Sequence, residues 1–444
     1  MGLPVIGETL QLLKSSPSLD IPDFYKLRFK RYGNLFKTSF VGEPVVVSMD
    51  MEFNRFVFRQ NDKLFQLWYP ETMMSILGKK TTATGIGQIH KHMRSIIAPL
   101  YAPKNLKAAF ISEMERIVAE SLRLWATKPS IDVKEAFTDL LFGITVKKVI
   151  GLEPESPRSR ELRKKFELFF QGLISFPLCV PGTKFYQSIQ ARKYVQKVIK
   201  DLLKQRISAP QRQNGDFLDI LVEDLQSGEA LVDENFMVDV VSGFIFAGIA
   251  LTPTTLALVV LPHLGMKFLT DNPNVVEALK EEHEAILKKR EEKNSRITWD
   301  ECKSMKFTNQ VINEIVRASS HTPGIFRKTL KDVQVNGYTI PKGWLVLINP
   351  MAVHLNPSIF KDPLTFNPWR WQEAQGSSLT KNFIAFGDGA RHCMGADFTK
   401  LQMAMFLHEL VTKYRWKEIK GGQKFRISDL VFLQDYHIQL FPRS

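Results

Sequence analysis

One short loop constrains the fold of this chain more than any other segment. Residues 386–395 read Phe-Gly-Asp-Gly-Ala-Arg-His-Cys-Met-Gly, and a helix is predicted to follow directly over 396–413. Gly389 and Gly395 have no Cβ atoms, so the backbone can turn sharply there and pass close beneath a flat group. Cys393 stands just before the helix, whose positive end and first N–H groups stabilise a thiolate anion. The loop therefore predicts a cysteine thiolate held at the start of a helix.

The residues around the cysteine suit a thiolate that binds haem iron. Phe386 can shield the sulfur and tune its electron donation, and Arg391 can form a charge-assisted pair with a haem propionate. The sequence therefore predicts Cys393 as the catalytic axial ligand of the iron of haem b. The residues predicted to hold this cofactor in the loop are Phe386, Gly389, Arg391, Cys393 and Gly395.

Other interpretations of the loop fit less well. A nucleophilic cysteine needs a base, and the adjacent His392 would rarely face it. A dinucleotide fingerprint needs a third glycine at another spacing, and covalently attached haem needs Cys-x-x-Cys-His. A glycine-rich loop with one buried cysteine can also be purely structural, and that alternative remains open.

The loop resembles the signature of the cytochrome P450 superfamily, and the resemblance covers essentially the whole chain. It implies a mostly α, α-rich α+β fold, a helical bundle around a buried haem with small β-sheets. The predicted organisation is a single haem-thiolate domain over 1–444. Residues 323–328, 366–371 and 412–416 resemble the plant clan that oxidises sterols, brassinosteroids and triterpenoids. That clan implies an N-terminal anchor in the endoplasmic reticulum membrane, missing here, and a catalytic domain facing the cytosol.

A Glu-x-x-Arg element strengthens the resemblance. Glu314 and Arg317 are three residues apart, so they lie on one helix face and can pair. The segment 366–371 resembles the family's Pro-x-Arg-Phe region, which implies that Arg370 completes a buried Glu–Arg–Arg network. Its implied role is structural. By itself, Glu-x-x-Arg is usually a solvated surface pair.

The resemblance implies that three further residues bind haem propionates. His90 and Arg94 match a Trp-x-x-x-Arg element with histidine in place of tryptophan. Arg327 matches a third such position. The alternative for each is an ordinary surface cation.

The distal helix departs from the family pattern Ala-Gly-x-(Asp/Glu)-Thr. Here Ala250 occupies the acid position and Leu251 the alcohol position, so the usual pair that delivers protons is missing. Thr252 or Thr254 is predicted to replace it catalytically, because Pro253 would distort the helix there. Back-bonding of these hydroxyls to helix carbonyls is the equally weighted alternative. Another alternative is that a hydroxyl group of the substrate orders the water that delivers protons.

The family's substrate-contacting regions carry no charge in this chain, which suits an apolar polycyclic lipid. Core packing is the alternative that apolar composition leaves open. The predicted substrate contacts are Trp68, Met74, Leu77, Phe176, Phe244, Ala247, Ala250, Leu251, Ile325, Phe326, Val431 and Phe432.

Charge and motifs indicate the partners. The net charge is +14, from 60 Lys and Arg against 46 Asp and Glu, which favours anionic partners. The basic residues are spread out and show no nucleic-acid pattern, so no nucleic acid is expected. The resemblance implies NADPH-cytochrome P450 reductase as the electron donor, with NADPH and flavins acting through it alone. A membrane surface and a monomeric state are also expected.

Three functions remain open from the sequence. The first is a monooxygenase that inserts oxygen into a plant-type sterol or triterpenoid. The second, motivated by Ala250 and Leu251, is a haem-thiolate isomerase or dehydratase that does not use O2. The third is a haem- or steroid-binding protein without catalysis.

Periodicity predicts the remaining elements. Cys179, in an apolar setting, is expected to be buried, and Cys302, on a polar helix, is expected at the surface. Predicted helices cover 24–32, 106–125, 160–173, 184–206, 234–269 and 273–293, and predicted hairpins cover 35–48 and 333–340.

Overall fold

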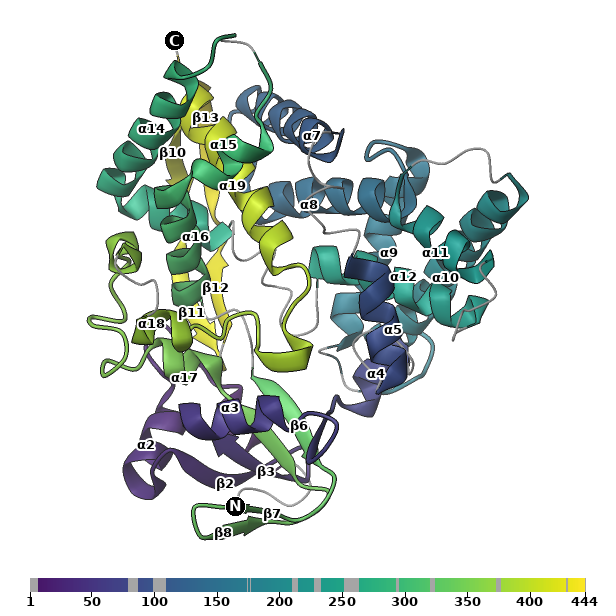
Figure 1. The fold of residues 1–444 in the computed structure, drawn as a ribbon, viewed down its shortest axis with the longest axis vertical. Coiled ribbons are helices and arrows are strands. Elements are labelled where there is room, and N and C mark those ends of the chain that lie inside the picture. The colour runs from purple at the N-terminus through teal and green to yellow at the C-terminus, as the bar shows by residue number, and fades with distance from the viewer. Residues whose placement is uncertain are drawn as a thin grey trace. The chain divides into compact units, whose positions relative to one another are not determined.

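The computed structural model describes most of the chain, and helices dominate it (Figure 1). The mostly α class with small sheets is therefore confirmed. The described residues are 7–78, 87–98, 109–173, 175, 177–209, 215–226, 233–250, 263–292, 295–319, 324–372, 377–428 and 430–443, without the side chains of 77, 109, 110, 170, 173 and 246–250.

The chain packs into two compact units. Unit 1 comprises Met1–Trp68, Lys107–Phe137 and Leu256–Ser444, and unit 2 comprises Tyr69–Leu106 and Thr138–Thr255. The organisation of 1–444 as one domain remains a prediction.

A helical layer forms the centre of unit 1, where α14, α16 and α19 pack on one another (Figure 1). Helix α19 is buried around most of its circumference, as expected of a helix with apolar residues on every side. Helix α7 and the short α15 also pack against it. The bounds are α7 Ala109–Ala126, α14 Pro273–Lys288, α15 Trp299–Ser304, α16 Lys306–Ser319 and α19 Ala396–Lys413.

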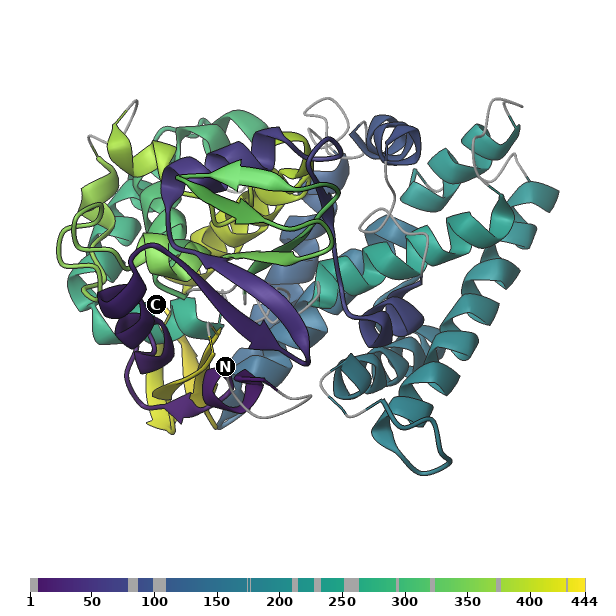
Figure 2. The ribbon, with the colours of Figure 1, turned by 90° about the horizontal axis from the view of Figure 1, so that it is seen from below.

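A five-stranded sheet in unit 1 joins segments that are far apart in the sequence. Its order is β2-β3-β9-β6-β4, and β3 pairs with β9 in parallel while the other pairs are antiparallel. The purple N-terminal strands lie beside the green later strands in Figure 2. The predicted hairpin over 35–48 is confirmed. The bounds are β2 Leu35–Phe40, β3 Glu43–Ser48, β4 Phe65–Leu67, β6 Ile325–Thr329 and β9 Leu345–Ile348.

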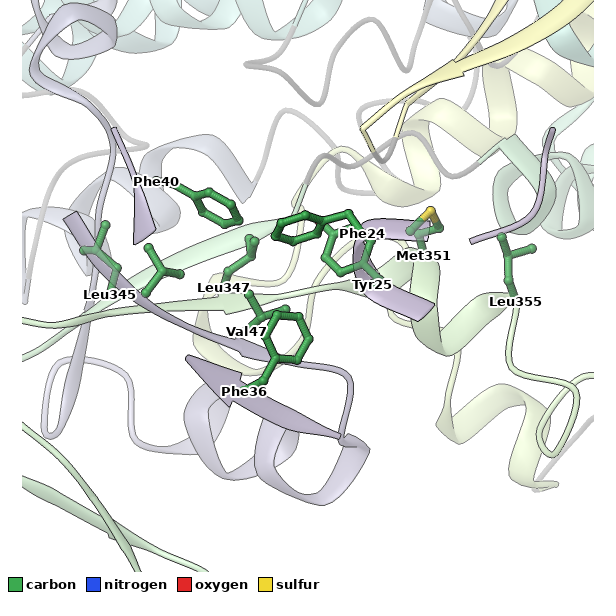
Figure 3. Packing of buried hydrophobic residues seen from close by; sticks show 10 residues of the cluster. Phe24, Tyr25, Phe36, Phe40, Val47, Leu345, Leu347, Met351 and Leu355 are labelled. Carbon is green, nitrogen blue, oxygen red and sulfur yellow. The ribbon is translucent and has the colours of Figure 1, made fainter. Parts of the chain in front are cut away.

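One apolar cluster joins this sheet to its neighbouring helices. Alternate residues of β2 and β3 point to the same face, as strand geometry requires, and they meet α2 (Asp23–Tyr32) and α17 (Pro350–His354) (Figure 3). The cluster contains Phe24, Tyr25, Phe36, Phe40, Val45, Val47, Leu345, Leu347, Met351 and Leu355.

The second predicted hairpin is also confirmed. Its turn residues Asn336 and Gly337 both have positive φ, at 47° and 81°, which a two-residue type I′ turn requires. Two further three-stranded sheets were not predicted from the sequence. These sheets use β1 Ser15–Ser16, β5 Ile131–Asp132, β10 Tyr414–Lys420, β11 Gln423–Ile427, β12 Leu430–Gln434 and β13 His437–Pro442, and the second hairpin pairs β7 Val333–Val335 with β8 Tyr338–Ile340.

Unit 2 is built from helices that pack around α10. A Cβ atom on Gly172 would lie 2.2 Å from Ser188 Cβ, so glycine lets α9 and α10 approach closely. Helix α8 (Val133–Ile150) begins in unit 1 and continues in unit 2. The other bounds are α4 Glu71–Leu77, α5 Gln88–Ile97, α9 Pro157–Leu173, α10 Lys184–Ser208, α11 Phe217–Gln226 and α12 Glu234–Ala250.

One predicted helix is clearly shorter in the structure, and another is described only in part. The helix predicted over 273–293 ends at Lys288, and Arg290 beyond it binds Glu301 of α15. The helix predicted over 234–269 is described only in part. Helix α12 covers its first part, and 263–271 is also helical. Residues 251–262 lie outside the described residues.

A buried chain of hydrogen bonds joins α14, α16 and α19. Thr308 donates its hydroxyl proton to Glu282 at 2.6 Å, so its oxygen accepts from His283 Nε2 at 3.0 Å. His283 Nδ1 then accepts from His408 Nδ1 at 3.0 Å. Burial lowers the pKa of His283 to about 3 and that of His408 to about 4, so both imidazoles are neutral at pH 7.

This pair predicts acid sensitivity. Unfolding returns each imidazole to a pKa of about 6.5, so below that pH the unfolded chain binds protons that the folded chain does not bind. The free energy of unfolding should fall as the pH drops below ~6.5, approaching about 1.4 kcal/mol per pH unit for each histidine. Urea unfolding of His408→Gln, followed across this range, should show a slope smaller by about one proton than wild type. An unchanged slope would contradict this expectation.

Candidate haem-thiolate site

The cysteine loop forms a tight structure directly before α19. The Cys393 N–H donates to the carbonyl of Phe386 at 2.9 Å, which closes the loop. Gly389 has a φ of 65°, and a Cβ atom there would lie 3.0 Å from the carbonyl oxygen of Phe58. Glycine at position 389 therefore lets the loop turn close against α3 (Met51–Arg59). A Cβ atom on Gly395 would lie 4.0 Å from the sulfur of Cys393.

The start of α19 faces this cysteine. Gly395 is the N-cap of the helix and makes no side-chain cap, so it leaves room beside the sulfur. The first N–H groups of a helix have no partner within it and carry partial positive charge. This position favours the thiolate of Cys393 over the thiol.

Two predicted cofactor-binding cations lie at the loop, Arg391 within it and Arg327 beside Phe58. The guanidinium of Arg327, on β6, lies 5.9 Å from the Phe58 ring, and the Phe58 carbonyl contacts Gly389. Arg391 lies in the loop itself, 3.7 Å from a carboxylate oxygen of Asp62. Arg327 is only 2% exposed, so it is a buried cation rather than a surface one.

A lysine that sequence reasoning missed also lies beside the loop. Lys400 follows one turn into α19, and its ammonium is 5.9 Å from the Phe383 ring centre and 6.0 Å from that of Phe386. Burial lowers the pKa of Lys400. In the sequence, only the spacing of Lys400 from Cys393 could have indicated that this lysine lies beside the loop. That spacing is not distinctive unless the aromatic contacts are known.

The structure brings together all three residues of the predicted Glu–Arg–Arg network. Glu314 Oε1 accepts from Arg317 Nη2 at 2.8 Å and from Arg370 Nε at 3.0 Å. Its Oε2 accepts from Arg317 Nε and from the indole of Trp371, both at 2.9 Å. The backbone N–H of Asn367 adds a fifth bond, at 3.0 Å.

This carboxylate is completely buried, as is its partner Arg317. A buried charge is tolerated only when its hydrogen-bonding capacity is filled. The five donors come from α16 and from the 366–371 region with its 3₁₀ helix η2 (Pro368–Trp371), so the network joins these two segments. Since α16 packs against α19, the network supports the helix that follows Cys393.

The other two predicted propionate-binding residues lie in unit 2. His90 and Arg94 are both on α5, four residues apart, and therefore on one helix face. His90 is buried and Arg94 is half-buried.

Some of the residues predicted to contact the substrate lie close to other aromatic residues. In unit 1 the rings of Trp68 and Phe326 lie 5.6 Å apart, and Phe432 stacks on Phe425. Ile325 is half-buried on β6, next to Phe326, while Val431 is fully buried on β12.

In unit 2, Met74 is half-buried on α4, and the ring of Phe244 lies 4.8 Å from that of Phe217. Several predicted positions lie outside the described residues or have side chains outside them. These are Leu77, Phe176, Ala247, Ala250, Leu251, Thr252 and Thr254.

The predictions for the other two cysteines are wrong. Cys179 is exposed in the loop before α10, whereas Cys302 is buried on α15. Burial raises the pKa of Cys302 to about 12, so it remains a thiol. The polar helix misled the prediction because α15 packs against α19, a tertiary contact that its own sequence does not indicate.

Comparison with known proteins shows the family. The cytochrome P450 family model matches residues 1–440. The chain is 46% identical to cytochrome P450 87A3 of rice, over 100% of this chain and 85% of that protein. It is 40% identical to β-amyrin 16α-hydroxylase of Maesa lanceolata and 39% identical to cucurbitadienol 11-hydroxylase of Siraitia grosvenorii, each over 100% of this chain and 92% of the relative.

A solved structure shows the same fold. Retinoic acid-bound cyanobacterial CYP120A1 superimposes with a TM-score of 0.84 at 26% identity, covering 100% of this chain and 98% of that one. The chain therefore belongs to the cytochrome P450 family. Membership confirms the predicted enzyme class, a monooxygenase, and haem as its cofactor.

The buried network predicts a large effect of one substitution. Glu314→Gln keeps the shape but removes the charge, leaving two arginines without their carboxylate, so unfolding should become easier by about 3–5 kcal/mol. Thermal unfolding with haem content monitored at the same time would measure this loss.

Glu120→Gln is the matched control. It removes a carboxylate from an exposed pair with Arg116 on α7, which should cost less than about 0.5 kcal/mol. Equal losses in the two variants would contradict a supporting role for the buried network.

Proposed function

We propose that the chain is a haem-thiolate monooxygenase that hydroxylates an apolar sterol or triterpenoid, with Cys393 as the axial ligand. One observation carries this proposal: the closed loop 386–395 presents a cysteine at the start of a buried helix. When bound, haem held by a thiolate would supply dioxygen activation: with two electrons from NADPH through a reductase and two protons, one oxygen atom would be inserted into a substrate C–H bond and the other would be released as water.

The residues of the chain fit such a group. The glycine at 389 keeps the loop tight against Phe58, and Phe386 is proposed to shield the sulfur from water. Arg327 and Arg391, both in unit 1, are proposed as cations for the propionates, and His90 and Arg94 on α5 are kept as further proposed propionate-binding residues. A buried guanidinium such as that of Arg327 is stabilised by an anion of this kind.

Apolar side chains support a hydrophobic substrate. Trp68 and Phe326 form a ring pair, and Met74 and Phe244 add apolar surface in unit 2. The printed names of two relatives identify β-amyrin and cucurbitadienol as their substrates. From that similarity we infer that this chain acts on a related polycyclic substrate.

Proton delivery is proposed to use Thr252 or Thr254, because Ala250 and Leu251 replace the usual acid and alcohol. The same replacement favours a second candidate, a haem-thiolate isomerase or dehydratase that uses no O2. Requirement for NADPH separates the two candidates.

We further propose NADPH-cytochrome P450 reductase as the electron donor and the endoplasmic reticulum membrane as the location. The net charge of +14 supports an acidic partner and an anionic lipid surface. Within the part of the chain that the structure describes, no helix is long and apolar enough to span a membrane. Exposed apolar side chains near the N-terminal end support peripheral contact with lipid: Leu10, Leu13, Leu27, Phe29, Tyr32 and Val41.

Reconstitution tests the function. Purified protein with reductase, NADPH and either β-amyrin or cucurbitadienol should yield a hydroxylated product only when NADPH is present. Cys393→Ser should lose the thiolate-type band in the carbon monoxide difference spectrum of the reduced protein and should form no product. A thiolate-type band that persists in Cys393→Ser would contradict the assignment. Conversion of a substrate or peroxide without NADPH would favour the second candidate.

Vesicle binding tests the membrane contact. Leu27→Ser with Phe29→Ser removes two exposed apolar groups from α2, and binding to vesicles that contain phosphatidylserine should weaken by at least about tenfold. Tyr338→Ser, also exposed but on β8, is the matched control and should bind like wild type. Equal binding by all three proteins would contradict this contact surface.

A further inference from the structure

A polar cluster in unit 2 joins three helices through one arginine. Arg192, in the middle of α10, donates from Nη1 to the carbonyl oxygen of Ser75 on α4 at 2.9 Å. Its Nη2 donates to Asp239 Oδ1 on α12 at 2.7 Å. Gln196, one turn further along α10, donates to the same oxygen at 2.6 Å. The arginine therefore contacts α4 and α12 at the same time.

The contact with α4 satisfies a group that the helix itself cannot satisfy. Ser75 lies in the last turn of α4, where carbonyl groups have no partner within the helix. A cation is favourable at this end because the helix dipole is negative there. Met73 and Ile76 are buried, while Met74 is half-buried and is proposed to contact the substrate. The position of Met74 therefore depends on how the end of α4 is held.

The contact with α12 is a partly buried ion pair. The Arg192 and Asp239 side chains are 22% and 18% exposed, so water screens their attraction less than at an open surface. Helix α12 carries Phe244 and ends at Ala250, both proposed to contact the substrate. A guanidinium donates in two directions from two separate nitrogens of one plane, whereas all three protons of a lysine ammonium leave a single nitrogen, so a lysine would have to reach both acceptors from one point.

We propose that Arg192 is a positioning residue: it fixes α4 against α12 and thereby determines which substrate carbon is oxidised. The proposal rests on the proposed function for its substrate, but the positioning itself concerns only unit 2. Arg192 does not touch the reacting atoms, and its effect passes through Met74 and the other substrate-facing side chains of these helices.

Three variants separate the contacts. Arg192→Met keeps much of the side-chain length and loses both contacts, whereas Arg192→Lys keeps the charge but must reach both acceptors from one nitrogen instead of two. Lys200→Gln is the matched control, because Lys200 also joins α10 to α12, through Asn235 at 2.6 Å, but does not contact α4. Substrate binding, read from the spin-state change of the iron, should weaken about tenfold in Arg192→Met. The ratio of hydroxylated products should also change, with an intermediate result for Arg192→Lys.

Hydrogen exchange without substrate gives an independent readout. Backbone amides of 71–78 should exchange at least about tenfold faster in Arg192→Met than in wild type or Lys200→Gln. Equal exchange in all three proteins, or an unchanged product ratio in Arg192→Met, would overturn the proposal. If wild-type protein converted neither β-amyrin nor cucurbitadienol, the proposed function would fail, and the exchange measurement would then decide the role of Arg192 alone.

Discussion

The buried carboxylate of Glu314 is the interaction on which the rest of unit 1 depends. It accepts five hydrogen bonds from donors in α16 and residues 367–371, at distances of 2.8 to 3.0 Å. A carboxylate at zero exposure is tolerated only when such donors fill its hydrogen-bonding capacity. Because α16 packs on α19, and α14 packs on both, this charge network supports the helix that follows the cysteine loop.

The proposed chemistry uses a division of roles between the two units. Unit 1 presents Cys393 at the start of α19, and Phe58 brings the loop and Arg327 together. Unit 2 contributes α4, α5 and α12, whose side chains supply the remaining predicted contacts. Rigid support by the buried helices of unit 1 suits the thiolate, because the position of a metal ligand must not vary. Substrate selection is proposed to depend on α4 and α12, which Arg192 joins through partly exposed contacts.

Local signals in the sequence predicted the local features correctly. The helix over 396–413 and the turn at Asn336 and Gly337 follow from periodicity and turn chemistry, and both are present. The i,i+3 spacing of Glu314 and Arg317 predicted their pairing. Features formed by distant segments were missed, including the C-terminal sheets, the His283–His408 pair and the surroundings of Lys400. These depend on tertiary contacts, and no pattern within one segment encodes them. The exposure of Cys179 and burial of Cys302 were wrong for the same reason.

The central claim is that the sulfur of Cys393 bonds to haem iron. X-ray absorption at the iron edge of the purified protein measures this bond directly, because sulfur and nitrogen scatter differently. The account predicts one sulfur atom in the first coordination shell of the iron, lost when Cys393 is replaced by serine. A first shell with only nitrogen and oxygen atoms in the native protein would contradict it.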